Sequence, residues 1–89
     1  MKEISIICNP KAGSGKASKK WRILQSQLDR SNLSYNIFFT EKPKHATELT
    51  LLAIKKGSNR IVSFGGDGTL NEVIQGMLLS PLNTNDNID

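Results

Sequence analysis

Three short runs of apolar residues alternate with longer amphipathic segments along the chain. The runs are Ile4–Cys8, Tyr35–Thr40 and Arg60–Phe64, and they favour β-branched or aromatic residues, as strands do. The first run is almost continuously apolar, which is typical of a strand that is covered on both faces. The pattern therefore predicts three strands of a buried sheet.

The segments that separate and follow these runs repeat apolar residues at helical spacing. We expect helices over Lys16–Arg30, over His45–Lys56 and from Thr69 to about Leu79. Thr69 and Glu72 have the spacing of a capping box, which predicts that the third helix begins at Thr69. The expected buried stripes are Ala17, Trp21, Leu24 and Leu28, then Ala46, Leu49, Leu52 and Ala53, and finally Leu70, Val73, Ile74, Met77 and Leu78.

The predicted order of elements is β-α-β-α-β-α. Such alternation gives an α/β fold, here a three-layer sandwich with a parallel sheet and helices on both faces. Ligands of these sheets bind beyond the carboxyl ends of the strands, which here carry Asn9–Lys16, Thr40 and Gly65–Thr69. We expect one domain over residues 1–80, followed by a polar, mobile tail over residues 81–89.

The glycine loop Gly65–Thr69 joins the third strand to the third helix. Its three glycines in four positions leave the backbone bare, so that a ligand can approach closely. The first N–H groups of a helix lack internal partners and attract phosphate. A plain tight turn is the alternative, and Asp67 between glycines makes that alternative less favoured.

The loop Asn9–Lys16 contains two glycines, two lysines and Ser14, so it too can face a phosphate. It is not a P-loop, because Pro10 and Ala17 stand where Gly and Ser or Thr are needed. It is not a dinucleotide fingerprint either, because Ser18 occupies the third glycine position. These residues alone leave a phosphate loop and a flexible surface turn equally open.

The composition of the chain suggests an anionic partner. The net charge is +4 and the pI is about 9.5, which suits nucleotide phosphate, a membrane surface or nucleic acid without choosing among them. Nucleic acid is not expected, since aromatic residues are not interleaved with Lys or Arg. Cys8 is the only cysteine, which excludes an internal disulfide and fits a reducing cytosol. His45 is a lone histidine at the start of the second helix, so we expect a surface or locally hydrogen-bonding residue rather than a catalytic one. A zinc site has little support, because no second histidine or cysteine is nearby.

Three segments together resemble the catalytic domain of the diacylglycerol kinase family, which includes bacterial lipid kinases and sphingosine kinases. Gly65–Val73 is similar to the nucleotide loop of that family, and Asn9–Gly13 to its Asn-Pro-x-Ser/Ala-Gly signature. Thr40–Ala46 is similar to its Thr-x-x-x-Gly-His-Ala segment, except that Lys44 replaces the glycine. The resemblance extends to about Leu79. Its expected fold is that of the N-terminal nucleotide-binding domain of diacylglycerol and NAD kinases.

The resemblance implies a kinase that transfers the γ-phosphoryl group of ATP, with Mg²⁺, to the hydroxyl of a lipid such as diacylglycerol. Asp67 is implied in the phosphate and Mg²⁺ network, where it reaches the metal through water. The residues implied in nucleotide binding are Asn9, Pro10, Lys11, Ala12, Gly13, Thr40, Gly66, Asp67, Gly68, Thr69, Leu70, Asn71 and Glu72.

The resemblance also implies more chain than these 89 residues. Members of the family add strands, a Gly-Thr-x-Asn-Asp type segment and a β-rich domain that supplies the general base and much of the lipid site. We therefore expect an N-terminal part that binds nucleotide weakly, holds no catalytic base and does not turn over lipid alone. Its open sheet edge favours self-association. We expect a cytoplasmic location, with peripheral membrane contact.

Two other functions compete with this interpretation. NAD kinases and phosphofructokinases also carry Gly-Gly-Asp-Gly followed by Thr or Ser, but NAD kinases lack the Asn9-Pro10 start and continue with apolar residues after the loop. The other competitor is a non-catalytic nucleotide-binding module, which is supported by the missing second domain.

Overall fold

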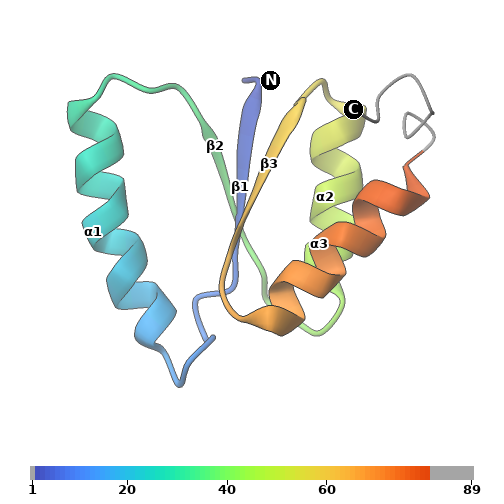
Figure 1. Ribbon diagram of the computed structural model, residues 1–89, viewed down its shortest axis with the longest axis horizontal. Coiled ribbons are helices and arrows are strands. Elements are labelled where there is room, and N and C mark those ends of the chain that lie inside the picture. Colours follow the sequence, from blue (N-terminus) through green and yellow to red (C-terminus); the bar gives the residue numbers. More distant parts are fainter. Residues whose placement is uncertain (1, 81–89) are drawn as a thin grey trace.

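Three parallel strands form the central sheet of the computed structural model, which describes residues 2–80 (Figure 1). They are β1 (Ile4–Cys8), β2 (Asn36–Phe39) and β3 (Arg60–Phe64), in the spatial order β2-β1-β3. Both outer strands pair with β1 in parallel. The predicted strands are confirmed, although β2 is one residue shorter at each end than the sequence suggested.

Helices cover both faces of this sheet. Helix α1 (Lys16–Arg30) lies on one face, and α2 (His45–Lys55) and α3 (Asp67–Leu79) lie together on the other (Figure 1). This arrangement follows from right-handed crossovers, because the chain moves outward from β1 to β2 and then back across β1 to β3. The predicted three-layer α/β fold is confirmed. The predicted tail, residues 81–89, lies outside the described residues.

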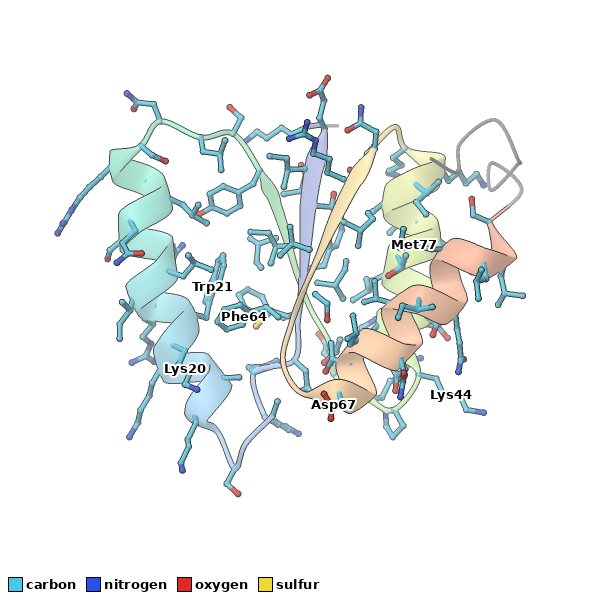
Figure 2. All side chains as sticks on the ribbon, viewed as in Figure 1. Lys20, Trp21, Lys44, Phe64, Asp67 and Met77 are labelled. Atoms are coloured by element: carbon cyan, nitrogen blue, oxygen red, sulfur yellow. The ribbon has the colours of Figure 1, made fainter. Side chains whose placement is uncertain are left out.

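Trp21 anchors the core between α1 and the sheet. It is buried together with Ile6 and Cys8, which alternate along β1 on the face toward α1. Its ring meets those of Tyr35, Phe39 and Phe64 edge to face, with centroids 6.0, 6.2 and 5.9 Å away. Figure 2 shows Trp21 and Phe64 facing each other across this layer. The expected inward stripe of α1 is therefore confirmed.

The opposite core joins β1 to the other two helices. Ile7, Ala46 and Val73 are buried there at the meeting point of β1, α2 and α3. The two helices approach closely because Gly76 has no side chain: a Cβ at that position would lie 2.8 Å from the Thr50 Cβ. Small residues thus set the contact between α2 and α3.

The buried face of α3 differs from the prediction. Val73 is buried as expected, but the other four members of the expected stripe, Leu70, Ile74, Met77 and Leu78, are 43–66% exposed. The face that packs inward carries Thr69, Val73 and Gly76. The prediction was wrong because close approach to α2 requires small residues, and because β3 is an edge strand of the described sheet. In α2, likewise, Ala46 and Ala53 are buried as predicted, whereas Leu52 is 38% exposed.

The predicted capping box of α3 is also wrong. The helix begins at Asp67, with Gly66 as its N-cap and no hydrogen bond from a capping side chain. Thr69 lies inside the first turn and is buried. The Glu72 carboxylate reaches α2 instead, where its Oε1 accepts a hydrogen bond from the Ala46 N–H at 3.3 Å. Across residues 2–80, every helix is too short or too polar to cross a membrane.

Candidate functional site

Three loops meet beyond the carboxyl ends of the strands, as the topology predicts. The Phe64 carbonyl accepts a hydrogen bond from the Asn9 N–H at 2.9 Å, and the Cys8 carbonyl accepts one from the Thr40 N–H at 2.9 Å. These bonds tie the loops after β2 and β3 to the loop after β1. The loops form one edge, at the bottom of the view in Figure 1.

A first pocket of about 370 Å³ opens at this edge between the β1, β2 and β3 loops. It brings together six of the predicted site residues: Asn9, Lys11, Thr40, Gly68, Thr69 and Glu72. Glu41, Lys42, Pro43 and Ala46 also line it, and the sequence argument had not singled them out as ligand contacts. Two predicted motifs and the start of a third therefore share one concave surface.

A second pocket of about 320 Å³ lies between the glycine loop and the start of α1. The predicted residues in it are Ala12, Gly13 and Gly66. Lys16 and Gly65, which belong to the two predicted loops, also line it, and Ala17, Lys20, Ser63 and Phe64 complete its wall and were missed. The spacing of Lys16 and Lys20 was the available signal, because residues four apart lie on the same side of a helix.

Four predicted residues line neither pocket: Pro10, Asp67, Leu70 and Asn71. Leu70 is 46% exposed on the open face of α3. Asp67 is exposed at the first position of α3, on the same edge as the loops (Figure 2). Within residues 2–80, no three His, Cys, Asp or Glu side chains gather closely enough to hold a metal ion. Asp67 alone still suits Mg²⁺, which usually keeps several waters and takes one or two carboxylates beside substrate phosphates.

The loop after β1 is held in a tight left-handed turn. Residues 13–15 have φ values of +64°, +58° and +90°, a conformation that favours Gly13 and Gly15. The Asn9 Oδ1 accepts a hydrogen bond from the Lys11 N–H at 3.1 Å, which fixes the start of the loop. As a result, α1 begins beside the glycine loop without a capping side chain.

The structural requirement for glycine differs among the three glycines of the loop after β3. Gly65 is required by the fold, because a Cβ there would lie 2.6 Å from the Thr69 Oγ1. At Gly66 and Gly68 a Cβ would meet nothing within 4 Å. Gly66 has an ordinary φ of −96°, and Gly68 lies in the first turn of α3. Neither of these two glycines is needed by the described chain, and each lines one of the two pockets.

Lys44, which replaces the glycine of the family segment, has a backbone conformation that glycine adopts easily. Lys44 is the N-cap of α2 and has a φ of +67°, in the left-handed region that glycine adopts without strain. The side chain of His45 turns back, and its Nδ1 accepts a hydrogen bond from the Glu41 N–H at 2.9 Å. The prediction that His45 is a local hydrogen-bonding residue is confirmed.

Glu72 connects the two helices at the rim of the first pocket. Its carboxylate accepts from the Ala46 N–H, and its backbone carbonyl accepts from the Thr47 hydroxyl at 2.7 Å. A carboxylate at the N-terminus of α2 is favoured by the helix dipole. This contact gives Glu72 a structural reason for its place, whereas its implied contact with a nucleotide remains a prediction.

Burial is the main cause of the two pKa shifts found among residues 2–80. Loss of solvent raises the pKa of the Cys8 thiol above its usual value, so this buried thiol stays neutral. Loss of solvent, followed by the hydrogen bond to Asp29, raises the pKa of Tyr35. Both groups belong to the α1 side of the core, so neither supplies chemistry to the pockets.

Comparison with known proteins decides the family. Residues 3–87 match the profile of the diacylglycerol kinase catalytic domain. The chain belongs to the diacylglycerol kinase catalytic domain family. Its curated relatives in the family include a diacylglycerol kinase of Staphylococcus haemolyticus, which is 33% identical over 85% of this chain and 23% of the relative.

Other relatives act on different lipids according to their names. A ceramide kinase of Arabidopsis thaliana is 30% identical over 91% of this chain and 14% of its own length. Human sphingosine kinase 1 is 30% identical over 88% of this chain and 21% of its own length. The chain thus spans less than a quarter of each of these three relatives. The predicted resemblance is confirmed at the level of a lipid kinase family.

Proposed function

We propose that these residues form the ATP-binding part of a lipid kinase that transfers the γ-phosphoryl group of ATP to a lipid hydroxyl. Membership of the diacylglycerol kinase catalytic domain family supports the reaction class. The convergence of three motifs on two adjoining pockets supports the location of the nucleotide. The proposal applies to a larger enzyme, in which other parts complete the lipid site.

The main support for the proposal is that packing within the described chain does not require glycine at position 66 or at position 68. Glycine in a helix, as at Gly68, costs up to about 1 kcal/mol relative to alanine, and at both positions alanine would meet no atom within 4 Å. The uncapped N–H groups of α3 begin between the two glycines. A phosphate group bound there accounts for both features, since it accepts hydrogen bonds from the backbone and leaves no room for a Cβ.

The charge of the second pocket suits a polyphosphate. Lys16 and Lys20 line that pocket without an acidic neighbour in its lining, whereas Lys11 and Lys42 in the first pocket are matched by Glu41 and Glu72. Phosphoryl transfer depends mainly on positioning and on neutralising the charge of the phosphates. In this proposal the backbone of the glycine loop orients the phosphates, and Asp67 holds Mg²⁺ through water. Mg²⁺, when bound, supplies further neutralisation of the transferred group.

The lipid acceptor is proposed to be an alcohol of the diacylglycerol type, with the general base outside these 89 residues. The family supports a lipid, and the names of its members span diacylglycerol, ceramide and sphingosine. On this proposal the 89-residue chain binds ATP weakly and is inactive by itself. A cytoplasmic, membrane-peripheral location and self-association through the open β3 edge belong to the same proposal, supported by the buried, reduced Cys8 and the exposed residues of α3.

Saturation-transfer NMR with ATP and Mg²⁺ tests the role of the glycine loop. We expect Gly68→Val to reduce the signal on the nucleotide at least tenfold, because its side chain fills the space proposed for phosphate. Gln75→Val is the matched control, since Gln75 is exposed on the same helix and lines neither pocket. Equal ATP binding by the native chain and by Gly68→Val would refute the proposed phosphate position.

A further inference from the structure

The loop between β2 and α2, residues 40–44, lies at the lower edge of Figure 1 and forms one wall of the first pocket. Residues 41–44 are all exposed, so packing against the core does not fix their conformation. The shape of this wall depends instead on the hydrogen bonds that the loop makes. The loop residues that line the pocket are Thr40, Glu41, Lys42 and Pro43.

His45 holds this loop through two hydrogen bonds. Its Nδ1 accepts a hydrogen bond from the Glu41 N–H at 2.9 Å, and its own N–H donates to the Lys42 carbonyl at 3.2 Å. The loop also carries the ion pair between Lys42 and Glu48 at 3.8 Å, but both side chains are about 60% exposed, and such pairs contribute little. The imidazole is therefore the main side-chain contact that closes the exposed part of the loop.

The hydrogen bond to the ring requires one protonation state. An imidazole nitrogen accepts a hydrogen bond only when it carries no proton, and both nitrogens of the imidazolium ion are donors. His45 is also the first residue of α2, where the positive end of the helix dipole opposes a positive charge. Protonation of His45 therefore removes the partner of the Glu41 N–H and favours release of the loop.

The charged groups around His45 have both signs. Two of the carboxylates have partners of their own, since Glu72 accepts from the Ala46 N–H and Glu48 pairs with Lys42. His45 is the only histidine of the chain, and histidine is the side chain whose charge ordinarily changes between pH 5 and pH 8. The neighbouring charges are Glu41, Lys42 and Lys44 of the loop, Glu48 of α2, Glu72 of α3 and Lys11 of the loop after β1.

We propose that His45 is a positioning residue for the nucleotide, because its neutral imidazole holds the β2–α2 loop in the conformation that forms the wall of the first pocket. This inference rests on the proposed function, since it takes the first pocket as part of the ATP site. His45 does not itself line the pocket, so it acts through the backbone of Glu41. ATP binding weakens at low pH as the ring gains a proton.

NMR titrations of the 89-residue chain with ATP and Mg²⁺, at pH 7.5 and at pH 5.5, test this role. His45→Asn is the rescue variant, because the asparagine Oδ1 takes nearly the place of the imidazole Nδ1 and accepts a hydrogen bond at both pH values. We expect the native chain and His45→Asn to bind ATP equally at pH 7.5. At pH 5.5 the native chain should bind about three- to tenfold more weakly than His45→Asn, which is the effect of one hydrogen bond.

Two further variants complete the comparison. His45→Leu has no acceptor, so it should bind ATP about three- to tenfold more weakly than the native chain at pH 7.5. Glu48→Gln is the matched control, because it removes the exposed ion pair of the same loop, and it should keep the native affinity within about twofold. Protonation of ATP itself is the same for every protein, so it cancels when affinities are compared at one pH.

The Glu41 amide reports the contact without nucleotide. Its proton should move upfield between pH 7.5 and pH 5.5 in the native chain, because it loses its acceptor, and should stay in place in His45→Asn. If that proton moves as expected while both chains bind ATP with the same affinity at pH 5.5, the hydrogen bond is only structural and the positioning role is refuted.

The remaining outcomes separate this inference from the proposed function. Tighter ATP binding by the native chain at pH 5.5 than by His45→Asn would mean that the imidazolium attracts phosphate directly, and would overturn the inference alone. Equal affinities of His45→Leu and the native chain at pH 7.5 would overturn it as well. An absence of ATP binding by every chain at both pH values would refute the proposed nucleotide site, and the positioning role with it.

Discussion

Two glycines of α3 offer a direct test of how this fold is packed. Gly68 and Gly76 lie in the same helix, but a Cβ at Gly68 would meet nothing within 4 Å. At Gly76 the added Cβ would lie 2.8 Å from the Thr50 Cβ and 2.9 Å from the Thr47 carbonyl oxygen. The same replacement by alanine should therefore change stability in opposite directions at the two sites.

The magnitudes follow from two competing effects. Alanine gains up to about 1 kcal/mol over glycine from helix propensity, and this gain is available at both positions. At Gly76 the opposing cost of overpacking is about 3 kcal/mol, the upper part of the usual range, because the neighbours are a Cβ and a backbone atom that cannot swing away. We expect Gly76→Ala to lower the free energy of unfolding by about 2 kcal/mol and Gly68→Ala to raise it by up to about 1 kcal/mol.

Urea unfolding followed by the fluorescence of Trp21 measures both variants, because Trp21 is the only tryptophan and is buried. For a domain of this size, a loss of about 2 kcal/mol corresponds to a fall of about 8–16 °C in Tm. If Gly76→Ala were as stable as the native chain, α2 and α3 would not be in the close contact described here. A destabilised Gly68→Ala would mean that the first turn of α3 is not open to solvent.

Three further predictions concern the backbone, the core thiol and the open face. Lys44→Gly should raise the free energy of unfolding by about 0.5–1 kcal/mol, because glycine adopts the left-handed conformation without strain. Asn32→Gly should gain less, because Asn32 has a φ of +58° and asparagine tolerates that region. Urea unfolding compares the two variants, and equal gains would refute the assignment of strain to Lys44. Because folding raises the pKa of the Cys8 thiol, this thiol contributes stability below pH 9.0, and the contribution is lost as the pH rises through the higher folded pKa. The free energy of unfolding should therefore fall less between pH 8 and pH 10 in Cys8→Ala than in the native chain. Identical falls in the two proteins would contradict the raised pKa. Self-association through the open β3 edge and the exposed face of α3 beside it should weaken in Ile74→Lys. Sedimentation equilibrium would detect this as a larger dissociation constant, and an unchanged constant would place any self-association elsewhere.

The sequence predicted the elements of this fold well because their signals are local. The apolar run Ile4–Cys8 and the stripe around Trp21 needed no knowledge of distant residues, and both lie where the pattern indicated. The buried face of α3 could not be found in this way. It depends on how closely α2 approaches at Gly76, and the more apolar side, with Ile74 and Met77, remains exposed.

The candidate site was predicted in outline for a similar reason. Parallel topology brings the strand ends together, so the grouping of Asn9, Thr40 and Gly68 followed from the order of elements. The second pocket did not follow, because its wall includes Gly13 from the left-handed turn before α1 and side chains of α1 itself, which strand order does not place. Glu72 was predicted to cap its own helix, but its carboxylate accepts a hydrogen bond from the Ala46 N–H, which is 26 residues away in the sequence.

The most direct test of the proposed nucleotide site is an NMR titration of the isotope-labelled chain with ATP and Mg²⁺, beside a sulfate series of matched ionic strength. The proposal predicts amide shifts confined to the chain around the two pockets, in residues 9–20, 40–46 and 63–72, that exceed those caused by sulfate. The amides of α1 residues 22–30 should not shift, because they lie away from both pockets. A well-dispersed spectrum in which ATP shifts no more than sulfate does, or shifts that are spread over the surface, would contradict a preformed nucleotide site in these residues.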